Sequence, residues 1–384
     1  MDFDLTPDQQ ALVRMVAGFA RDHVAPAQAE MERDNRFPIK AWAAWSDLGM
    51  AGAMIPEAHG GSGLDSLSYL LCVEELAATS QTFTQIWQIH SLVSLLIADL
   101  GTPEQQAALL PDLAAGRKTP AFALTEPGAG SDAAAIRTRA DRQPDGGWRL
   151  NGTKTFITNT GSDISDGTVV FAVTGQRPGG RPAITAFHVP RDTPGFSWGP
   201  PLPKMAWHGL HTRELALADV RLRADQQLGP EGGAFSAALR SLTLGRIGLA
   251  ALACGLARAC RDLSLDYALQ RQQFGKPIAA FQLTQAKLAD MAAHHDAMCH
   301  MTHHAAWLHA TGRECQAAAS MAKLVTSRLA ASIARDAMLI HGGSGYMTDT
   351  PANRLFREAQ VLEIGEGTTE IQQIILARHM GCPA

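Results

Sequence analysis

Glu366 lies between two glycines in the run Gly365-Glu366-Gly367-Thr368-Thr369. A glutamate carboxylate can act as a general base, and it becomes a stronger base when a bound substrate expels water from around it. Taken alone, a glutamate between two glycines is more often a solvated loop residue. The assignment of a base therefore depends on the other residues that the chain places beside Glu366.

Two further runs could hold phosphate or the edge of a ring. The first, Thr125-Glu126-Pro127-Gly128-Ala129-Gly130-Ser131-Asp132, offers hydroxyls, backbone N–H groups and glycines that permit close approach. A plain connector with Asp132 as a cap explains it as well. In the second, Arg271-Gln272-Gln273-Phe274-Gly275, the arginine is a natural ligand for a pyrophosphate. A basic helix C-terminus that stops at Gly275 is the alternative.

A cluster of histidines suggests a metal site as a second kind of chemistry. Its members are His294, His295, His300, His303, His304 and His309. Asp296, His300 and His304 fall at positions i, i+4 and i+8 of a predicted helix, a spacing that places them on one face. Surface histidines are the simpler interpretation, so we predict no metal.

The elements that position these residues change character along the chain. A chain of 384 residues is expected to form two or three domains. Thr6-Pro7-Asp8-Gln9 and Thr102-Pro103-Glu104-Gln105 are capping-box helix starts. Apolar residues at helical spacing predict further helices over 12–32, 39–48, 66–79 and 91–100.

After about residue 148 the pattern is typical of short strands, and after Gly232-Gly233 it is helical again. Strands are predicted over 153–158, 168–174, 184–189 and 214–222, and long helices over 235–270, 281–310 and 316–339. We therefore predict an α+β fold with an N-terminal helical domain (1–120), a middle β-barrel-like domain (121–232) and a C-terminal four-helix bundle (233–384).

Composition excludes several classes of partner. The net charge is −4 and no long Lys/Arg block is present, which argues against nucleic acid. The longest uncharged apolar stretch, 247–257, is too short to cross a bilayer. The acidic N-terminus lacks the pattern of a secretory signal, and the six cysteines are scattered, so we expect reduced thiols and a cytoplasmic location.

Taken together, the motifs resemble the acyl-CoA dehydrogenase family. The run from Thr125 to Asp132, followed by Lys154-Thr155-Phe156-Ile157-Thr158-Asn159, carries the resemblance most specifically. The motifs at 271–277, 341–346 and 363–372 agree with it, and the match extends from Leu5 to Met380. The resemblance implies FAD as cofactor, an acyl-CoA substrate and an electron-transferring flavoprotein as partner.

In this pattern Glu366 is the base that removes the α-proton of the thioester while a β-hydride passes to flavin N5. Arg271 and its neighbours reach the FAD of an adjacent subunit, so a homotetramer is implied. The residues on cofactor-binding positions are Phe122, Leu124, Thr125, Ser131, Phe156, Thr158, Arg271, Gln273, Phe274, Gln282, Gly342, Gly343, Thr368 and Glu370. Leu339 replaces a frequent glutamine and Gly365 a frequent tyrosine, so the FAD contact and the ring near the base differ here.

The substrate side is less specific. Thr243 and Arg246 match a helix beneath the active site, and Ser131 would face flavin phosphate or the CoA chain. The segment 81–90 contains no cation for a second carboxylate, and Phe83 and Trp87 are expected to shorten the pocket. A short, branched or cyclic monocarboxylic acyl group is therefore favoured.

Three alternatives remain open on the same scaffold. One is an oxidase or a desulfinase-like enzyme. Another is a carrier-protein-tethered acyl group in place of the CoA ester. The third is a flavin-free, non-catalytic subunit of a hetero-oligomer.

Overall fold

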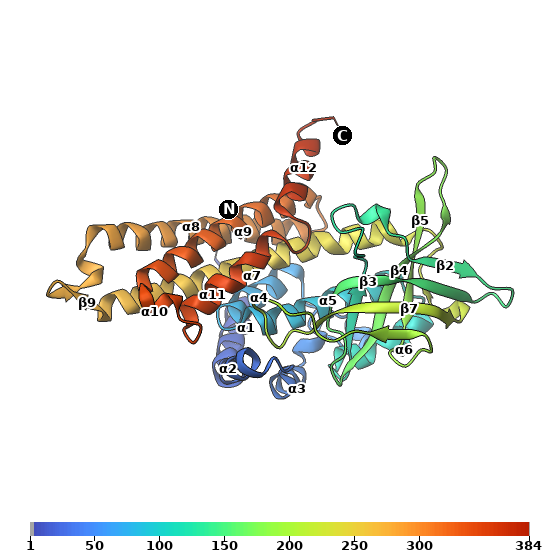
Figure 1. Cartoon of the computed structure of the whole chain (residues 1–384), viewed down its shortest axis with the longest axis horizontal. Helices are drawn as coiled ribbons and strands as arrows, with labels where there is room; N and C mark the ends of the chain where they lie inside the picture. Colours follow the sequence, from blue (N-terminus) through green and yellow to red (C-terminus); the bar gives the residue numbers. More distant parts are fainter. Residues whose placement is uncertain (1–3, 384) are drawn as a thin grey trace.

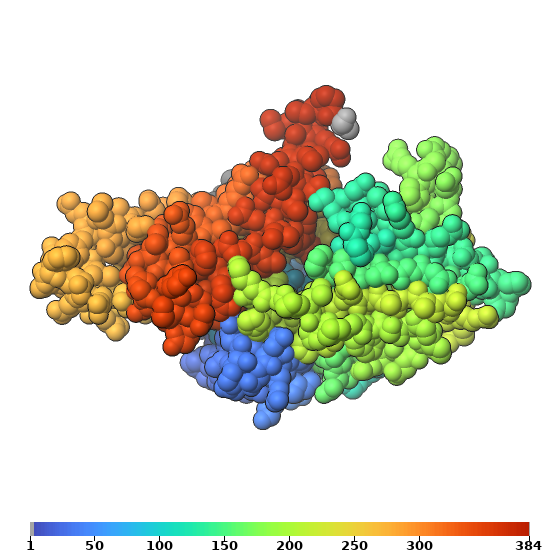
Figure 2. Space-filling model, viewed as in Figure 1, coloured from blue at the N-terminus to red at the C-terminus, as the bar shows by residue number. Residues whose placement is uncertain are grey.

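The computed structural model describes residues 4–383; Met1, Asp2 and Phe3 of the acidic N-terminal segment and Ala384 lie outside it. Helices, strands and helices follow one another along the chain in three blocks (Figure 1). The strands lie at one end, the hairpin that contains β9 lies at the other, and the N-terminal helices pack alongside (Figures 1 and 2). The predicted α+β arrangement is confirmed.

The N-terminal block is helical, and both predicted capping boxes are present. Thr6 Oγ1 accepts from Gln9 N (3.2 Å), and Thr102 Oγ1 accepts from Gln105 N (3.3 Å). A π-helical turn (Ala20–Val24) separates the first two helices. The helices are α1 (Pro7–Phe19), α2 (Ala25–Asp34), α3 (Ile39–Asp47), α4 (Ser66–Ala77), α5 (Gln81–Leu100) and α6 (Pro103–Ala114).

Helix α5 begins ten residues before the predicted start at Ser91. Ser80 caps it by accepting from Phe83 N (3.1 Å). Most of its residues are buried, because it packs against α4, α6 and α7 together. Its first turns do carry apolar residues at helical spacing, namely Phe83, Ile86 and Trp87, so this earlier start was within reach of the sequence and was missed.

The middle block is one mixed sheet of eight strands. Its order is β6-β7-β3-β2-β4-β5-β8, with β1 beside β4. The pairings of β4 with β1 and β2 are parallel and the others antiparallel. The strands are β1 (Thr119–Ala123), β2 (Arg139–Arg142), β3 (Trp148–Thr158), β4 (Ser165–Gln176), β5 (Pro182–Val189), β6 (Phe196–Trp198), β7 (Thr212–Leu222) and β8 (Gln227–Leu228).

The C-terminal block is built on three long helices that pack on one another, with three shorter ones on α9. The helices are α7 (Ala234–Gln270), α8 (Gln282–Ala310), α9 (Gln316–His341), α10 (Gly343–Tyr346), α11 (Pro351–Ala359) and α12 (Thr369–His379). A small hairpin of β9 (Gln272–Gln273) and β10 (Lys276–Pro277) joins α7 to α8. All three predicted long helices are present.

Helix α7 is long and apolar enough to cross a bilayer, but 78% of its most apolar stretch is buried inside the protein. It therefore has the character of a core helix. The predicted domain boundaries lie near changes of element: β1 begins at Thr119, two residues before position 121, and α7 begins at Ala234. All six cysteines are free thiols.

Candidate active site

The loop that carries Glu366 is fixed through its backbone. Arg246 Nε from α7 donates to the Glu366 carbonyl (3.4 Å), and Lys323 Nζ from α9 donates to the Gly367 carbonyl (2.9 Å). Gln372 Nε2 from α12 donates to both carbonyls (3.2 and 2.9 Å). Glu366 itself has φ +55°, a left-handed conformation that is costly for a non-glycine residue. Three helices thus hold the loop and compensate its backbone strain.

The carboxylate of Glu366 is left without a partner. Its Oε2 is buried, although the residue as a whole is half-buried, and it has no hydrogen-bond partner among residues 4–383. Burial raises the pKa of Glu366, while the nearby charges of Arg246 and Lys323 act to lower it. A buried carboxylate with a raised pKa and no hydrogen bond is suited to accept a proton.

Gly245 in α7 makes room for this carboxylate. A Cβ at position 245 would lie 2.7 Å from Glu366 Oε2 and 3.1 Å from Leu92 Cδ1. The Glu366 carboxylate therefore packs directly against the helix backbone. The sequence interpretation had assigned Arg246 to this region and passed over the glycine beside it.

A small cavity of ≈ 10 Å³ opens beside Glu366, between α4, α5 and α7. Its apolar lining comes from Ile89, Leu92 and Leu244. Its polar lining comes from Tyr69, Gln85, Gln88 and Ser91.

Phe83 and Trp87, which we expected to shorten the pocket, do not line this cavity. Both are fully buried in the core of the N-terminal block. Phe83 packs on Trp45, with ring centroids 6.1 Å apart, and Trp87 lies 4.7 Å behind the Tyr69 ring. The helical repeat places Gln85, Gln88 and Ile89 on the face of α5 that lines the cavity. Trp87 reaches the cavity only indirectly, because it packs against Tyr69, which lines it.

A buried ion pair joins the two motifs that carried the resemblance. Lys154 Nζ lies 2.8 Å from Glu126 Oε1 and donates to the Leu124 carbonyl (3.0 Å). The Glu126 carboxylate also accepts from the backbone N–H groups of Arg137 (2.6 Å) and Thr138 (2.9 Å). Burial lowers the pKa of Lys154 to about 8, and its pairing with Glu126 opposes this.

The sequence interpretation assigned no role to Glu126 or Lys154, although both lie inside the quoted motifs. Thr155 N donates to the Thr125 carbonyl (3.0 Å), directly beside the pair. The pair and this hydrogen bond hold the Thr125 loop against β3. Thr125, Phe156 and Thr158 are thereby brought together.

Phe156 is presented to solvent rather than to the core. Its φ is +59° and its ring is 68% exposed, at a register shift between β3 and β7. The neighbouring Thr155 and Ile157 are buried instead. Thr158 is half-buried and Ser131 is exposed. Phe122 packs on Phe171 (4.9 Å between centroids), and Leu124 is buried.

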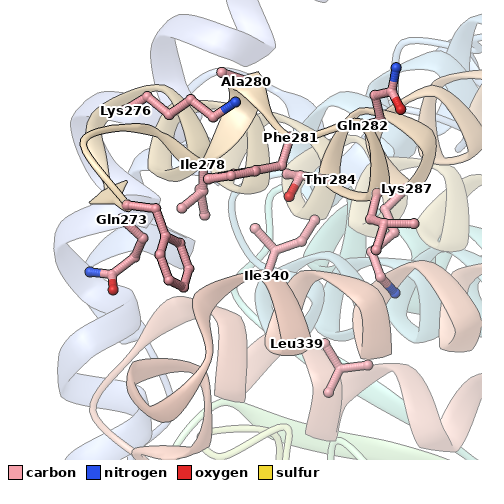
Figure 3. Close-up of a pocket in the computed structure, with 12 residues that line it drawn as sticks. Gln273, Lys276, Ile278, Ala280, Phe281, Gln282, Thr284, Lys287, Leu339 and Ile340 are labelled. Atoms are coloured by element: carbon pink, nitrogen blue, oxygen red, sulfur yellow. The ribbon is translucent and has the colours of Figure 1, made fainter.

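A second predicted group lies at the other end of the molecule. Gln273, Phe274, Gln282 and Leu339 line one hollow of ≈ 820 Å³ between the β9–β10 hairpin, α8 and α9. Figure 3 shows Leu339 and Ile340 of α9 across from Ile278, Phe281 and Thr284. Phe274 has φ +52° and is 93% exposed, and Arg271 is exposed at the base of the hairpin.

Of the remaining predicted residues, Gly342, Thr368 and Glu370 lie at ends of helices and Thr243 lies inside α7. Gly342 (φ +59°) ends α9 next to His341, which stacks on Tyr267 with centroids 4.3 Å apart. Thr368 caps α12 by accepting from Ile371 N (3.4 Å), and Glu370 is exposed in its first turn. Thr243 is half-buried, and its hydroxyl donates to the Leu239 carbonyl (3.2 Å), as a helix residue does without any ligand.

The histidine cluster is not simply a solvated face, as we had interpreted it. His300 and His304 are exposed, whereas His295 and His303 are half-buried against α4. His303 Nε2 lies 2.8 Å from Glu74 Oε2, and Cys299 Sγ lies 3.5 Å from both Glu74 Oε1 and His295 Nε2. Glu74, His295 and Cys299 form the group that could hold an ion, which differs from the face of Asp296, His300 and His304.

Comparison with known proteins agrees with the geometry. The family models described as acyl-CoA dehydrogenase N-terminal, middle and C-terminal domains match residues 6–117, 121–220 and 232–381. The chain belongs to the acyl-CoA dehydrogenase family. A relative named acyl-CoA dehydrogenase, from Bacillus subtilis, is 42% identical over 377 residues, covering 98% of this chain and 98% of that protein.

Two solved acyl-CoA dehydrogenase structures have the same fold. Butyryl-CoA dehydrogenase from Megasphaera elsdenii gives a TM-score of 0.94 at 37% identity, covering 99% of this chain and 100% of that one. Glutaryl-CoA dehydrogenase from Mycobacterium smegmatis, in complex with FADH2, gives 0.92 at 31% identity, covering 98% and 95%. The protein is an FAD-dependent oxidoreductase of this family.

The chain fits the flavin of acyl-CoA dehydrogenases on its own evidence. A Cβ added at any of four motif glycines would meet nothing within 4 Å, so packing within the chain does not require glycine there. These positions are Gly128, Gly130, Gly342 and Gly343. Together with the exposed rings of Phe156 and Phe274, they leave space for an external planar and phosphorylated group.

Proposed function

We propose that this enzyme introduces a double bond between Cα and Cβ of a short acyl-CoA thioester, with Glu366 as the base. The unpartnered, buried Oε2 of Glu366 carries this proposal. Arg246, Lys323 and Gln372 hold the backbone carbonyls of the loop and leave the carboxylate free. A base fixed in this way needs little reorganisation when it accepts the α-proton.

When bound, FAD supplies the acceptor for the β-hydride at its N5 atom. On this chain Phe122, Leu124, Thr125, Phe156 and Thr158 would hold the ring system. Ser131, Thr368 and Glu370 lie on neighbouring positions of the family pattern. Residues of a second subunit, namely Arg271, Gln273, Phe274, Gln282, Gly342 and Gly343, would hold the rest.

The two groups cannot serve one cofactor within one chain. Arg246, beside the base, and Arg271, at the hairpin, are separated by 25 residues of α7 and its cap, or about 37 Å at 1.5 Å per residue. An extended dinucleotide is shorter than this separation. We therefore infer that the site is assembled between copies of the chain in a homotetramer.

Small substrate size is supported by the cavity beside Glu366, which has space for about one water molecule in this state. We propose a short acyl group, branched or cyclic forms included, with Arg246 and Thr243 on the substrate side. An electron-transferring flavoprotein is the proposed electron acceptor. A cytoplasmic location stays a prediction from the scattered cysteines.

Anaerobic reduction of the holoenzyme by a panel of acyl-CoA thioesters tests this function. Short acyl-CoA esters are expected to bleach the flavin absorption and to yield the α,β-unsaturated product. The Glu366→Gln variant should keep its flavin but lose both bleaching and exchange of the substrate α-proton with solvent. Exchange that persists in this variant would show that another residue is the base.

The alternatives give different results in the same assays. Oxygen uptake with each turnover indicates an oxidase, and sulfite release indicates a desulfinase-like enzyme. Activity with the acyl-carrier-protein ester but not with the CoA ester indicates a tethered substrate. A preparation that never retains flavin, even when supplied with FAD, indicates a non-catalytic subunit.

A further inference from the structure

The cavity beside Glu366 has an unsatisfied polar wall. Gln85 and Gln88, both on α5, line it and are 8% and 7% exposed. Neither Gln85 Oε1 nor Gln88 Nε2 has a hydrogen-bond partner among residues 4–383. A buried amide atom without a partner lowers the stability of a fold. Ser91 Oγ of the same helix also lines this cavity and likewise has no partner within that range. The cavity wall beside Glu366 therefore contains an unsatisfied amide oxygen, an unsatisfied amide NH₂ group and an unsatisfied hydroxyl.

Two glycines of helix α7 leave room for the Glu366 carboxylate and for the Gln88 amide. A Cβ at Gly248 would lie 2.2 Å from Gln88 Oε1, just as a Cβ at Gly245 would lie 2.7 Å from Glu366 Oε2. Residues three apart share one face of a helix and differ by about 4.5 Å along its axis. The Gln88 amide thus lies about one helical turn beyond the carboxylate. A group bound there belongs to the part of an acyl chain beyond Cβ.

The residues that line the cavity also disfavour an acyl chain with a charged distal end. Apart from Glu366, every residue that lines this cavity is neutral, and no arginine or lysine is among them. A distal carboxylate would be desolvated without a counter-ion. An acyl chain that ends in hydrocarbon would leave the two amides without hydrogen-bond partners. A site built to bind a hydroxyl or an amide discriminates strongly against a substrate that lacks one.

Resting on the proposed function, we propose that this enzyme selects a short acyl thioester that carries a neutral hydroxyl or carboxamide near its distal end. Both groups donate and accept hydrogen bonds, so either can satisfy Gln88 Nε2 and Gln85 Oε1 together. The cavity of ≈ 10 Å³ has the size of about one water molecule, which can serve the amides before substrate arrives. The polar group of the substrate then takes the place of that water.

Anaerobic flavin reduction of the wild-type holoenzyme tests this with pairs of thioesters that have equal numbers of non-hydrogen atoms. One pair is 4-hydroxybutanoyl-CoA and pentanoyl-CoA; the other is succinamoyl-CoA and 4-methylpentanoyl-CoA. Succinyl-CoA serves as the charged analogue. The polar member of each pair should reduce the flavin at least about tenfold faster at subsaturating concentration, as expected for loss of a buried hydrogen-bond partner.

Faster or equal reduction by the hydrocarbon members, or by succinyl-CoA, would overturn this specificity and leave the proposed dehydrogenase activity intact. If no acyl-CoA reduces the bound flavin, both the activity and the specificity fail. The two failures are therefore separate observations.

Variants test whether the Gln85 and Gln88 amides cause the preference for polar acyl groups. Gln88→Leu and Gln85→Leu should each lower the ratio of polar to apolar rates by about tenfold. Gln81→Leu is the matched control, because Gln81 is a buried glutamine on the same helix whose Nε2 donates to the Ala77 carbonyl (2.5 Å) and which does not line the cavity. An unchanged ratio in both cavity variants, with flavin retained, would contradict the proposal.

Discussion

At the scale of single residues, Glu366, the proposed base, is held by side chains that hydrogen-bond to the backbone of its loop and not to its carboxylate. The side chains of Arg246, Lys323 and Gln372 end on the carbonyls of residues 366 and 367. Arg246 and Lys323 also add positive charge near the base, which opposes the effect of burial on the pKa of Glu366. The loop is therefore rigid, while the basicity of the carboxylate depends on the balance between burial and charge.

The pH dependence of flavin reduction should report this balance. Burial raises the pKa of Glu366 above 4.5, and only the deprotonated form accepts the α-proton, so the rate should fall as pH falls through the raised value. Lys323→Met removes a charge that lowers this pKa, so the midpoint should move to higher pH. Stopped-flow reduction below pH 8, where Lys323 remains charged given its pKa of about 8, measures the midpoint.

Lys323→Arg is the control for this experiment, because it keeps the charge and the ability to donate to the Gly367 carbonyl. Its midpoint should stay near that of the wild type. A midpoint that stays the same or falls in Lys323→Met would mean that Lys323 acts only as a structural support for the loop.

Sequence reasoning could propose Glu366 as the base, but it could not find the residues that hold its loop. Glu366 and Arg246 lie in recognisable motifs, whereas Lys323 is an isolated lysine in an alanine-rich helix and gives no sign of being buried. Gln372 is the last residue of the motif at 363–372, and by its type and place it looks like any helix residue. Their roles depend on contacts between α7, α9 and α12, which no local pattern encodes.

At the scale of elements, the packing of α5 against α7 determines what the site contains. The long helices and four strands, β3, β4, β5 and β7, were predicted near their observed bounds, whereas the short strands β1, β2, β6 and β8 were not predicted. The first turns of α5 were missed, although Phe83, Ile86 and Trp87 recur there at helical spacing. Assigning Phe83 and Trp87 to the pocket failed because α5 is buried on nearly all sides, and the orientation of such a helix cannot be inferred from hydrophobicity alone.

Gly245→Ala should separate stability from catalysis in α7. Alanine is favoured over glycine within a helix by about 1 kcal/mol, but its Cβ would lie 2.7 Å from Glu366 Oε2. We expect unfolding in urea at an equal or slightly higher midpoint, retained flavin and flavin reduction slowed by about 100-fold, as expected when a base is displaced by about 1 Å.

Ser241→Ala, one turn earlier in α7 and half-buried, is the control for a change in the helix that does not meet the base. It should reduce flavin at the wild-type rate. Wild-type kinetics in Gly245→Ala would show that the carboxylate can move without loss, and would remove the structural reason for glycine at this position.

At the scale of the whole molecule, the long α7 separates two half-sites. Strand β3, which carries Phe156 and Thr158, lies at the sheet end of the molecule, whereas the β9–β10 hairpin, which forms one side of the hollow lined by Phe274, Gln282 and Leu339, lies at the far end (Figure 1). Each group lies in a motif of the sequence. The distance between the two groups, however, follows only from the observation that α7 is one continuous helix of 37 residues. Neither group forms a complete cofactor site alone.

Mixing two inactive variants should therefore restore activity. Arg271→Ala removes the pyrophosphate ligand, and Glu366→Gln removes the base. When a subunit of each kind pairs, one site combines Glu366 of the first with Arg271 of the second and is intact, while the other site carries both changes. We expect each variant alone to be inactive under limiting FAD. Co-expressed hetero-oligomers, purified through two different tags, should recover about one working site per pair.

The control is a chain that carries both substitutions, co-expressed with either single variant, because no intact site can form in that combination. Native mass spectrometry shows that the subunits have mixed, and bound flavin is counted by absorption. Activity that stays absent in verified Arg271→Ala and Glu366→Gln hetero-oligomers would mean that both residues serve one cofactor within one chain. That result would require α7 to bend or break between Arg246 and Arg271, contrary to the continuous helix that links them.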